Sequence, residues 1–478
     1  MQCATWWWLF ISLHTYGGLA SPLAVVAIVG LAGFLGLYYA AVCSAFIHLT
    51  HANRSYRAIV FASLWLLAEL GRVTFFTGFP WGEGGYAHLD GPFANLAKLV
   101  GVHGLTFGSA LVAAAFAGLM LRPHLRHASF IAAGVLISIS GNALLKLEKD
   151  SLFALTSAYP AASSSTAKPF TVTLLQGNIA QDEKFQSNKG IPDALQWYGE
   201  QLKAAKTSLV VTPETALPLL PEQLPEGYLA ELLNHFYQPR LGAPPIAALI
   251  GIPLGNNEAG YSNSVIGLKP KTEGGDFPEH LTNNSPANAN ANDVYRYDKH
   301  HLVPFGEFVH PLFKWFLSIV NIPLSDFNSG PLSQPSFVWQ GQRLAPNICY
   351  EDLFGEELAA RFVDPALAPT MFVNVSNIGW FGNTVAIDQH VNISRMRALE
   401  FERSMIRATN TGATVIIDHR GQVTHALERH TRGVLTGEVA GRSGITPYAW
   451  WAARFGLWPL WLFGLSVVAV AFIRRRAT

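Results

Sequence analysis

Ala345-Pro346-Asn347-Ile348-Cys349-Tyr350-Glu351-Asp352 is a short apolar stretch that runs into a helix-like segment, residues 353–363. Cys349 therefore lies at a predicted strand-to-helix turn, where rigid backbone can hold a reactive side chain toward a cleft. The other two cysteines, Cys3 and Cys43, lie in the apolar N-terminal part of the chain. A lone thiol among charged neighbours is a candidate nucleophile. Most free cysteines are small buried apolar residues, however, and position alone favours neither interpretation.

Short apolar runs closed by Gly, Pro or Asn predict further buried strands. They lie at residues 169–179, 208–212, 246–254, 371–375 and 413–418. Helical patterns lie between them, at residues 193–205, 356–363 and 387–407. Alternation of this kind predicts an α/β or layered α/β/α domain, which we place at residues 168–442.

The rest of the chain has the composition of a membrane protein. Half of the 478 residues are hydrophobic and only 14% are charged. Apolar runs, each about long enough to cross a membrane as a helix, lie at residues 22–49, 58–79, 97–121, 128–145 and 455–473. We therefore expect a helical membrane domain at 1–150 and a closing span at 455–473. The 33 Lys and Arg nearly balance the 32 Asp and Glu, which gives no reason to expect nucleic acid as a partner.

Basic residues in the short loops predict the orientation, because such loops favour the cytoplasmic side. They lie at residues 51–57, at residues 122–127 and in the tail Arg474-Arg475-Arg476, whereas the loop 78–95 carries Glu83 and Asp90 and no Lys or Arg. Counting the spans through, the large domain is expected outside the cytoplasm.

Two charges stand inside the expected span 58–79. Glu69 and Arg72 are three residues apart and share a helix face. Charges in a membrane are costly, so we expect the two to pair, although they could instead face the headgroup end of a lipid cleft.

Further polar residues follow the predicted strands or stand in loops. Glu214 comes directly after the strand at 208–212, where partial burial would make it a useful base. Lys299 could stabilise an oxyanion, although each residue alone could be an ordinary loop charge. His300-His301 gives only a weak metal signal, since adjacent histidines do not face one ion well, and we expect neither a metal nor a cofactor.

Together, a Glu, a Lys and a Cys at strand ends resemble the nitrilase (carbon–nitrogen hydrolase) superfamily. Within it, the chain is similar to the bacterial apolipoprotein N-acyltransferases. The resemblance rests on Gly78-Phe79-Pro80-Trp81, Leu89-Asp90-Gly91-Pro92, the segment 212–218, Lys299-His300-His301-Leu302-Val303-Pro304-Phe305-Gly306-Glu307, Ile348-Cys349-Tyr350-Glu351 and Trp380-Phe381-Gly382. It implies a multi-span helical membrane domain joined to an α-β-β-α sandwich.

The resemblance also implies roles for single residues. Cys349 would attack a phospholipid ester and become a thioester, Glu214 would act as general base, and Lys299 would stabilise the oxyanion. Glu307 and Glu351 would be supporting acids near the triad. Tyr350 would help to shape the acyl pocket.

The resemblance further implies the partners and the location. The acyl donor would be a phospholipid, and the acceptor would be the α-amino group of the lipidated N-terminal Cys of an apolipoprotein. The protein would be a monomer in the bacterial inner membrane, with its catalytic domain in the periplasm. The apolar segment 309–322 could be a membrane-dipping lid or a core helix.

The sequence departs from the family in places. The family carries more N-terminal spans, so the chain is expected to lack the first helices. Phe185 replaces a Trp of the family, and Ile378 stands where an acid is common.

The alternatives to an N-acyltransferase are a membrane-tethered amidase or nitrilase acting on a small amide, and a non-catalytic membrane scaffold or transporter.

Overall fold

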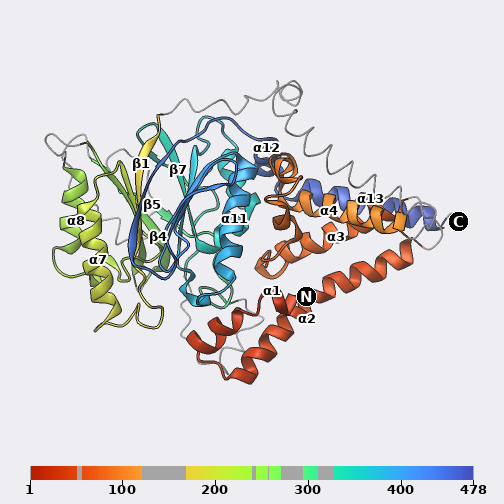
Figure 1. The fold of residues 1–478 in the computed structure, drawn as a ribbon, viewed down its shortest axis with the longest axis horizontal. Coiled ribbons are helices and arrows are strands. Elements are labelled where there is room, and N and C mark those ends of the chain that lie inside the picture. Colours follow the sequence, from red (N-terminus) through yellow and green to blue (C-terminus); the bar gives the residue numbers. More distant parts are fainter. Residues whose placement is uncertain are drawn as a thin grey trace.

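The protein has two parts. The computed structural model describes residues 2–50, 56–120, 168–238, 244–256, 258–270, 294–309 and 327–476. Figure 1 shows a layered sandwich of strands and helices beside a group of long helices that extends away from it. Helix α11 (Ala386–Phe401) lies on the face of the sandwich that meets the long helices. A site on the side of the sandwich that carries α11 would therefore lie near the long helices.

Two six-stranded sheets form the centre of the described sandwich. The first has the order β12 (Gly433–Val439), β1 (Phe170–Gln176), β2 (Leu209–Val211), β3 (Ala247–Asn256), β4 (Gly260–Leu268) and β5 (Tyr295–Asp298). The second has the order β11 (Val423–Ala426), β10 (Val415–Ile417), β9 (Ser404–Thr409), β8 (Met371–Ser376), β7 (Gln342–Ile348) and β6 (Phe337–Trp339). Strands β1, β2 and β3 are parallel, and so are β7, β8 and β9. The carboxyl ends of parallel strands meet at one edge, where α/β folds bind their ligands.

The core has three apolar layers, because the strands alternate their side chains between two faces. One layer lies between the sheets and joins residues such as Leu174 and Leu249 to Val373 and Ile406. A second packs α7 (Gly190–Ala204) and α8 (Tyr228–Tyr237) on the first sheet. A third packs α10 (Gly355–Ala359), α11 and α12 (Pro447–Phe455) on the second sheet. The expected α-β-β-α sandwich is confirmed.

Four described helices have the length and apolar composition to cross a membrane. They are α2 (Ser21–Leu49), α3 (Arg57–Thr74, extended as a 3₁₀ turn to Thr77), α4 (Ala97–Met120) and α13 (Trp458–Arg476). Helix α3 packs against each of the other three. The helices coincide with four of the five expected spans; the span at 128–145 and nearly all of the apolar segment 309–322 lie outside the described residues.

The charged pair inside α3 is tightly bound. Arg72 donates a hydrogen bond to the Glu69 carboxylate at 2.8 Å, and both side chains are buried. Arg72 also donates to the carbonyl oxygens of Phe79 and Trp81, at 3.1 and 2.9 Å. The expected pairing is therefore confirmed, and it also fixes the loop that leaves the helix.

One expected element was wrong. The helical pattern at 387–407 predicts a single helix, but α11 ends at Phe401 and Ser404–Thr409 forms strand β9. The backbone turns at Glu402, whose φ of +48° lies in the left-handed region and ends the helix. All six residues of β9 are buried, and the strand pairs with β8 and β10.

Candidate active site

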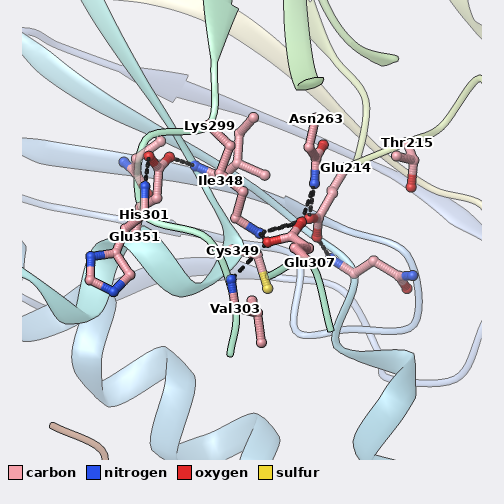
Figure 2. A network of polar contacts seen from close by, with 12 residues as sticks. Glu214, Thr215, Asn263, Lys299, His301, Val303, Glu307, Ile348, Cys349 and Glu351 are labelled. Carbon is pink, nitrogen blue, oxygen red and sulfur yellow. Dashed lines mark hydrogen bonds and ion pairs between the residues drawn. The ribbon is translucent and has the colours of Figure 1, made fainter. Parts of the chain in front are cut away.

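Strand ends bring the three predicted catalytic side chains together. Glu214 follows β2, Lys299 follows β5 and Cys349 follows β7. Strand β5 is antiparallel to β4, and β4 is antiparallel to β3, so β5 ends at the same edge as β2 and β3. Figure 2 shows the Cys349 sulfur beside the group formed by Lys299, Glu214 and Glu307.

Cys349 sits in a strained turn. Its φ is +52°, a left-handed conformation that costs a non-glycine residue of the order of 1 kcal/mol and is common at functional sites. The side chain is partly exposed and packs on the apolar layer between the sheets. Burial, and after it the negative charge of Glu214, raises the pKa of the thiol to about 12. The resting thiol therefore holds its proton at neutral pH and needs a base when it attacks.

Glu214 has the properties of that base. Its Oε1 accepts from Asn263 Nδ2 at 2.7 Å and from Lys299 Nζ at 3.2 Å, and its Oε2 accepts from Asn377 N at 2.8 Å. Burial would raise the pKa of Glu214, but the cations Lys299 and Lys184 and these hydrogen bonds hold it below its ordinary value. The carboxylate is thus ionised and ready to accept a proton at neutral pH.

Lys299 is held between two carboxylates. Its Nζ lies 3.2 Å from Glu214 Oε1 and 2.8 Å from Glu307 Oε2, and its side chain is only 1% exposed. Burial would lower the pKa of Lys299, but Glu214 and Glu307 raise it above its ordinary value. Asn263 Nδ2 also donates to Glu307 Oε1 at 2.8 Å. Lys299 is therefore a fixed cation, as stabilisation of an oxyanion requires.

Glu351 joins the Lys299 loop to the Cys349 turn. Its carboxylate accepts from Ile348 N at 2.5 Å, from His300 N at 2.7 Å and from the Tyr297 hydroxyl at 2.8 Å. His301 N donates a weaker bond at 3.3 Å. Burial raises the pKa of Glu351 above its ordinary value. Glu351 thus holds the backbone next to Lys299 and the backbone next to Cys349, and these bonds do not involve the thiol.

We expect Glu351→Gln to lower the free energy of unfolding by about 2 kcal/mol or more, because its –NH₂ would face a backbone N–H donor and leave it unpaired. Tyr297→Phe removes one donor only and should cost about 1 kcal/mol. Thermal unfolding in detergent measures the stability of both variants. Equal stability of Glu351→Gln and the wild type would contradict the role of Glu351 in holding the two backbone segments.

Tyr350 connects the catalytic turn to the end of α3. Its hydroxyl donates to the carbonyl oxygen of Gly78 at 3.1 Å, and its ring packs among residues of the long helices. His301 Nε2 lies 2.9 Å from the carbonyl oxygen of the neighbouring Thr77, and its Nδ1 lies 2.9 Å from Glu357. His300 Nδ1 instead faces Gly330 O, so the two histidines have separate partners. Within the described ranges, no group of three or more His, Cys, Asp or Glu side chains is placed to hold a metal ion.

A buried polar network holds the carbonyl group of Cys349. Arg407 Nη2 lies 2.8 Å from His390 Nδ1, and because Arg can only donate, that nitrogen accepts and Nε2 carries the proton. His390 Nε2 then donates to Asp352 Oδ1 at 2.8 Å and to Cys349 O at 3.2 Å. Asn374 Nδ2 also donates to Cys349 O, at 3.3 Å. These bonds help to hold the strained turn in place.

Several of these residues are absent from the sequence-based prediction. His390 and Arg407 lie in the segment 387–407 that the sequence predicts as a helix, whereas Asn263 lies in β4 and Asn377 directly follows β8, and no local motif marks these residues. Lys184 follows β1, whose carboxyl end lies at the same edge as Glu214. Lys184 lies eight residues beyond Gln176, the last residue of β1, so the rule that singled out Glu214, a polar residue directly after a strand, does not reach it. Of the family departures, Phe185 is exposed and Ile378 is buried.

Comparison with known proteins gives two family matches. Residues 1–115 match the apolipoprotein N-acyltransferase N-terminal domain. Residues 171–448 match the carbon–nitrogen hydrolase family. The first match covers α2, α3 and most of α4, and the second covers the sandwich.

Curated relatives match along nearly the whole chain. An apolipoprotein N-acyltransferase of Verminephrobacter eiseniae is 55% identical over 467 residues, which are 95% of this chain and 81% of that protein. One of Ralstonia nicotianae is 40% identical, covering 98% of this chain and 82% of that protein. Among solved structures, an amidase from Nesterenkonia sp. is 15% identical with a TM-score of 0.38, covering 63% of this chain and 98% of that one.

Proposed function

Because the chain belongs to the apolipoprotein N-acyltransferase family, we propose that it moves a fatty acyl group from a phospholipid to the α-amino group of a lipidated N-terminal Cys. The protein is an acyltransferase of the membrane. The proposal rests on one observation. Glu214, Lys299 and Cys349 lie together at an edge of the sandwich that is hydrogen-bonded to the backbone at the end of α3.

In the first half-reaction, the Cys349 sulfur attacks the carbonyl carbon of the acyl ester and its proton passes to Glu214. Because the pKa of Glu214 is low and the pKa of the Cys349 thiol is high, the proton has to move to Glu214 while the S–C bond forms. The carbonyl oxygen becomes an oxyanion within reach of Lys299. The ester C–O bond then breaks, and Glu214 returns the proton to the departing lysophospholipid oxygen.

In the second half-reaction, the neutral α-amine of the acceptor attacks the thioester carbon. The C–N bond forms, Glu214 accepts a proton from the nitrogen, and the C–S bond breaks. The proton returns to the Cys349 sulfur, so the products are an amide and a free thiol. This is a ping-pong reaction with a covalent intermediate. The low exposure of Glu214, Lys299 and Glu307 limits water near the thioester and favours aminolysis over hydrolysis.

The orientation of the helices supports a catalytic domain outside the cytoplasm. The Arg474 guanidinium lies 6.0 Å from the centre of the Tyr56 ring, so the basic end of α13 lies beside the start of α3. The other end of α3 leads to Thr77 and Gly78, which bond to His301 and Tyr350 of the sandwich. Basic ends favour the cytoplasmic face. We therefore place the sandwich in the periplasm and the helices in the inner membrane.

The division of the chain belongs to the same proposal. Residues 1–150 form the membrane domain, 168–442 the catalytic domain and 455–473 the closing span. A single chain carries Glu214, Lys299 and Cys349, so we propose that the monomer is active. Glu307 and Glu351 act as supporting acids, and Tyr350 borders the acyl pocket.

The test is acyl transfer to the enzyme itself. We expect the purified protein, given phospholipid with a labelled acyl chain and no acceptor, to gain a label that hydroxylamine removes. A diacylated lipopeptide should then take up the label as an amide. A folded protein that stays unlabelled would contradict the proposal, and release of free fatty acid in place of amide would indicate a hydrolase.

A further inference from the structure

Lys184 is a second buried cation beside the base. Its side chain comes from the segment between β1 and α7, and only 2% of the residue is exposed. Its Nζ donates to the carbonyl oxygen of Glu214 at 3.0 Å and to Thr215 Oγ1 at 2.7 Å. Thr215 has a φ of +46°, so this lysine binds both residues of a strained turn. A buried charge carries a large desolvation cost, and two bonds to uncharged oxygens do not require an ammonium group.

The charges of the site give a reason for the second cation. Glu214 and Glu307 are negative, and Lys299 and Lys184 are positive, so these four groups are neutral together while the thiol is protonated. The nearby Asp352 and Arg407 pair with each other at 3.3 Å. When Cys349 attacks, its proton neutralises Glu214 and one negative charge appears on the substrate oxygen. Glu307, Lys299 and Lys184 then sum to one positive charge, which balances the oxyanion.

Without Lys184, the same groups carry one uncompensated negative charge throughout, on the two carboxylates at rest and on the oxyanion during the attack. An unpaired charge in a buried site is strongly unfavourable. Resting on the proposed function, we infer that Lys184 is a positioning residue for acyl transfer: it fixes the Glu214 turn and supplies the charge that balances the oxyanion. It acts through Glu214 and does not need to touch the substrate.

The charge on Lys184 should also shape the pH dependence of the reaction. Burial lowers the pKa of Lys184 to about 8, while Glu214 and then Cys349 act in the opposite direction. On its own segment, Asp182 is exposed and Glu183 pairs with the exposed Lys189. Lys184 therefore loses its proton as the pH rises past about 8, and the balancing charge is lost with it.

The experiment measures single-turnover labelling of the full-length protein by acyl-labelled phospholipid across a pH series. Lys184→Met removes the charge and the hydrogen bonds, whereas Lys184→Gln removes the charge but keeps N–H donors. Lys189→Met is the matched control on the same segment. We expect both Lys184 variants to label about 10- to 100-fold more slowly at neutral pH, and Lys189→Met to label like the wild type.

The shape of the profile separates charge from packing. Loss of the cation should raise the pKa of Glu214, so the acid limb should move upward by about one pH unit or more. The alkaline fall of the wild type should be missing in both variants. A wild-type profile for Lys184→Gln, or an equal loss at every pH, would overturn the inference. If Lys184→Met does not fold, as judged by size-exclusion chromatography, Lys184→Gln decides alone. A wild-type protein that stays unlabelled would contradict the proposed function itself, and this inference with it.

Discussion

Cys349→Ala should abolish acyl transfer and leave no hydroxylamine-sensitive label on the protein. The loss should be of the order of 10⁶-fold, the size expected when a catalytic nucleophile is removed. Cys349→Ser should rescue little, because a hydroxyl is harder to deprotonate than a thiol and Glu214 is a weak base. Both variants should keep the wild-type fold, since each changes a single partly exposed side chain.

The other two cysteines are the natural controls. Cys3 and Cys43 are exposed, so each could react with an activated acyl group without any help from the site. Cys3→Ala and Cys43→Ala should label at the wild-type rate. A label that persists in Cys349→Ala would contradict the assignment of the nucleophile. Loss of the label in Cys3→Ala or Cys43→Ala would show that the acyl group attaches to that cysteine instead.

Lys299→Met should remove both activity and stability. The substitution leaves Glu214 and Glu307 buried without the cation between them, at a cost of about 3 to 5 kcal/mol in the free energy of unfolding. Acylation should fall by about 10²- to 10³-fold, because the oxyanion loses its nearest cation. Lys98→Met is the comparison: Lys98 pairs with Glu402 at 3.0 Å in a partly exposed site and should contribute less than about 1 kcal/mol.

A double variant separates the two losses. Lys299→Met with Glu307→Gln leaves Glu214 opposite Lys184, so the buried charges balance again. We expect thermal stability to recover by more than half while acylation stays low. Recovery of activity in the double variant would show that Lys299 acts only on stability, and recovery of neither would contradict the charge argument.

The sequence predicts Glu214 and Cys349 as site residues because each of them follows a predicted strand. Glu214 follows a run of buried Val and Thr, and Cys349 follows an apolar stretch. Both are therefore expected at the end of a strand, which lies at the edge of a sheet. Lys299 has no such pattern before it and was found through the resemblance of its segment, 299–307. The distances among the three side chains depend on the direction of β5, which only the sheet order reveals.

The buried charges could not be predicted in the same way. Residues 387–407 read as one amphipathic helix because Arg and Glu recur along them, and an Arg within a strand core is rare. Arg407 is nevertheless fully buried in β9, where Asp352, Asn374 and His390 supply its partners from other elements. Such partners are set by tertiary packing, and a local pattern contains no information about them. The same holds for Asn263, which lies 49 residues from Glu214 in the chain.

The bonds from Tyr350 to Gly78 and from His301 to Thr77 attach the neighbours of Cys349 and Lys299 to the backbone that ends α3. They are bonds to main-chain carbonyl groups, so no side-chain rotation on the α3 side can release them. The Cys349 thiol consequently stands at a set height relative to α3. Under the proposed function, we expect a lipid whose ester group reaches that height to react and one whose ester lies deeper not to react, so that substrates are selected by depth as well as by chemistry.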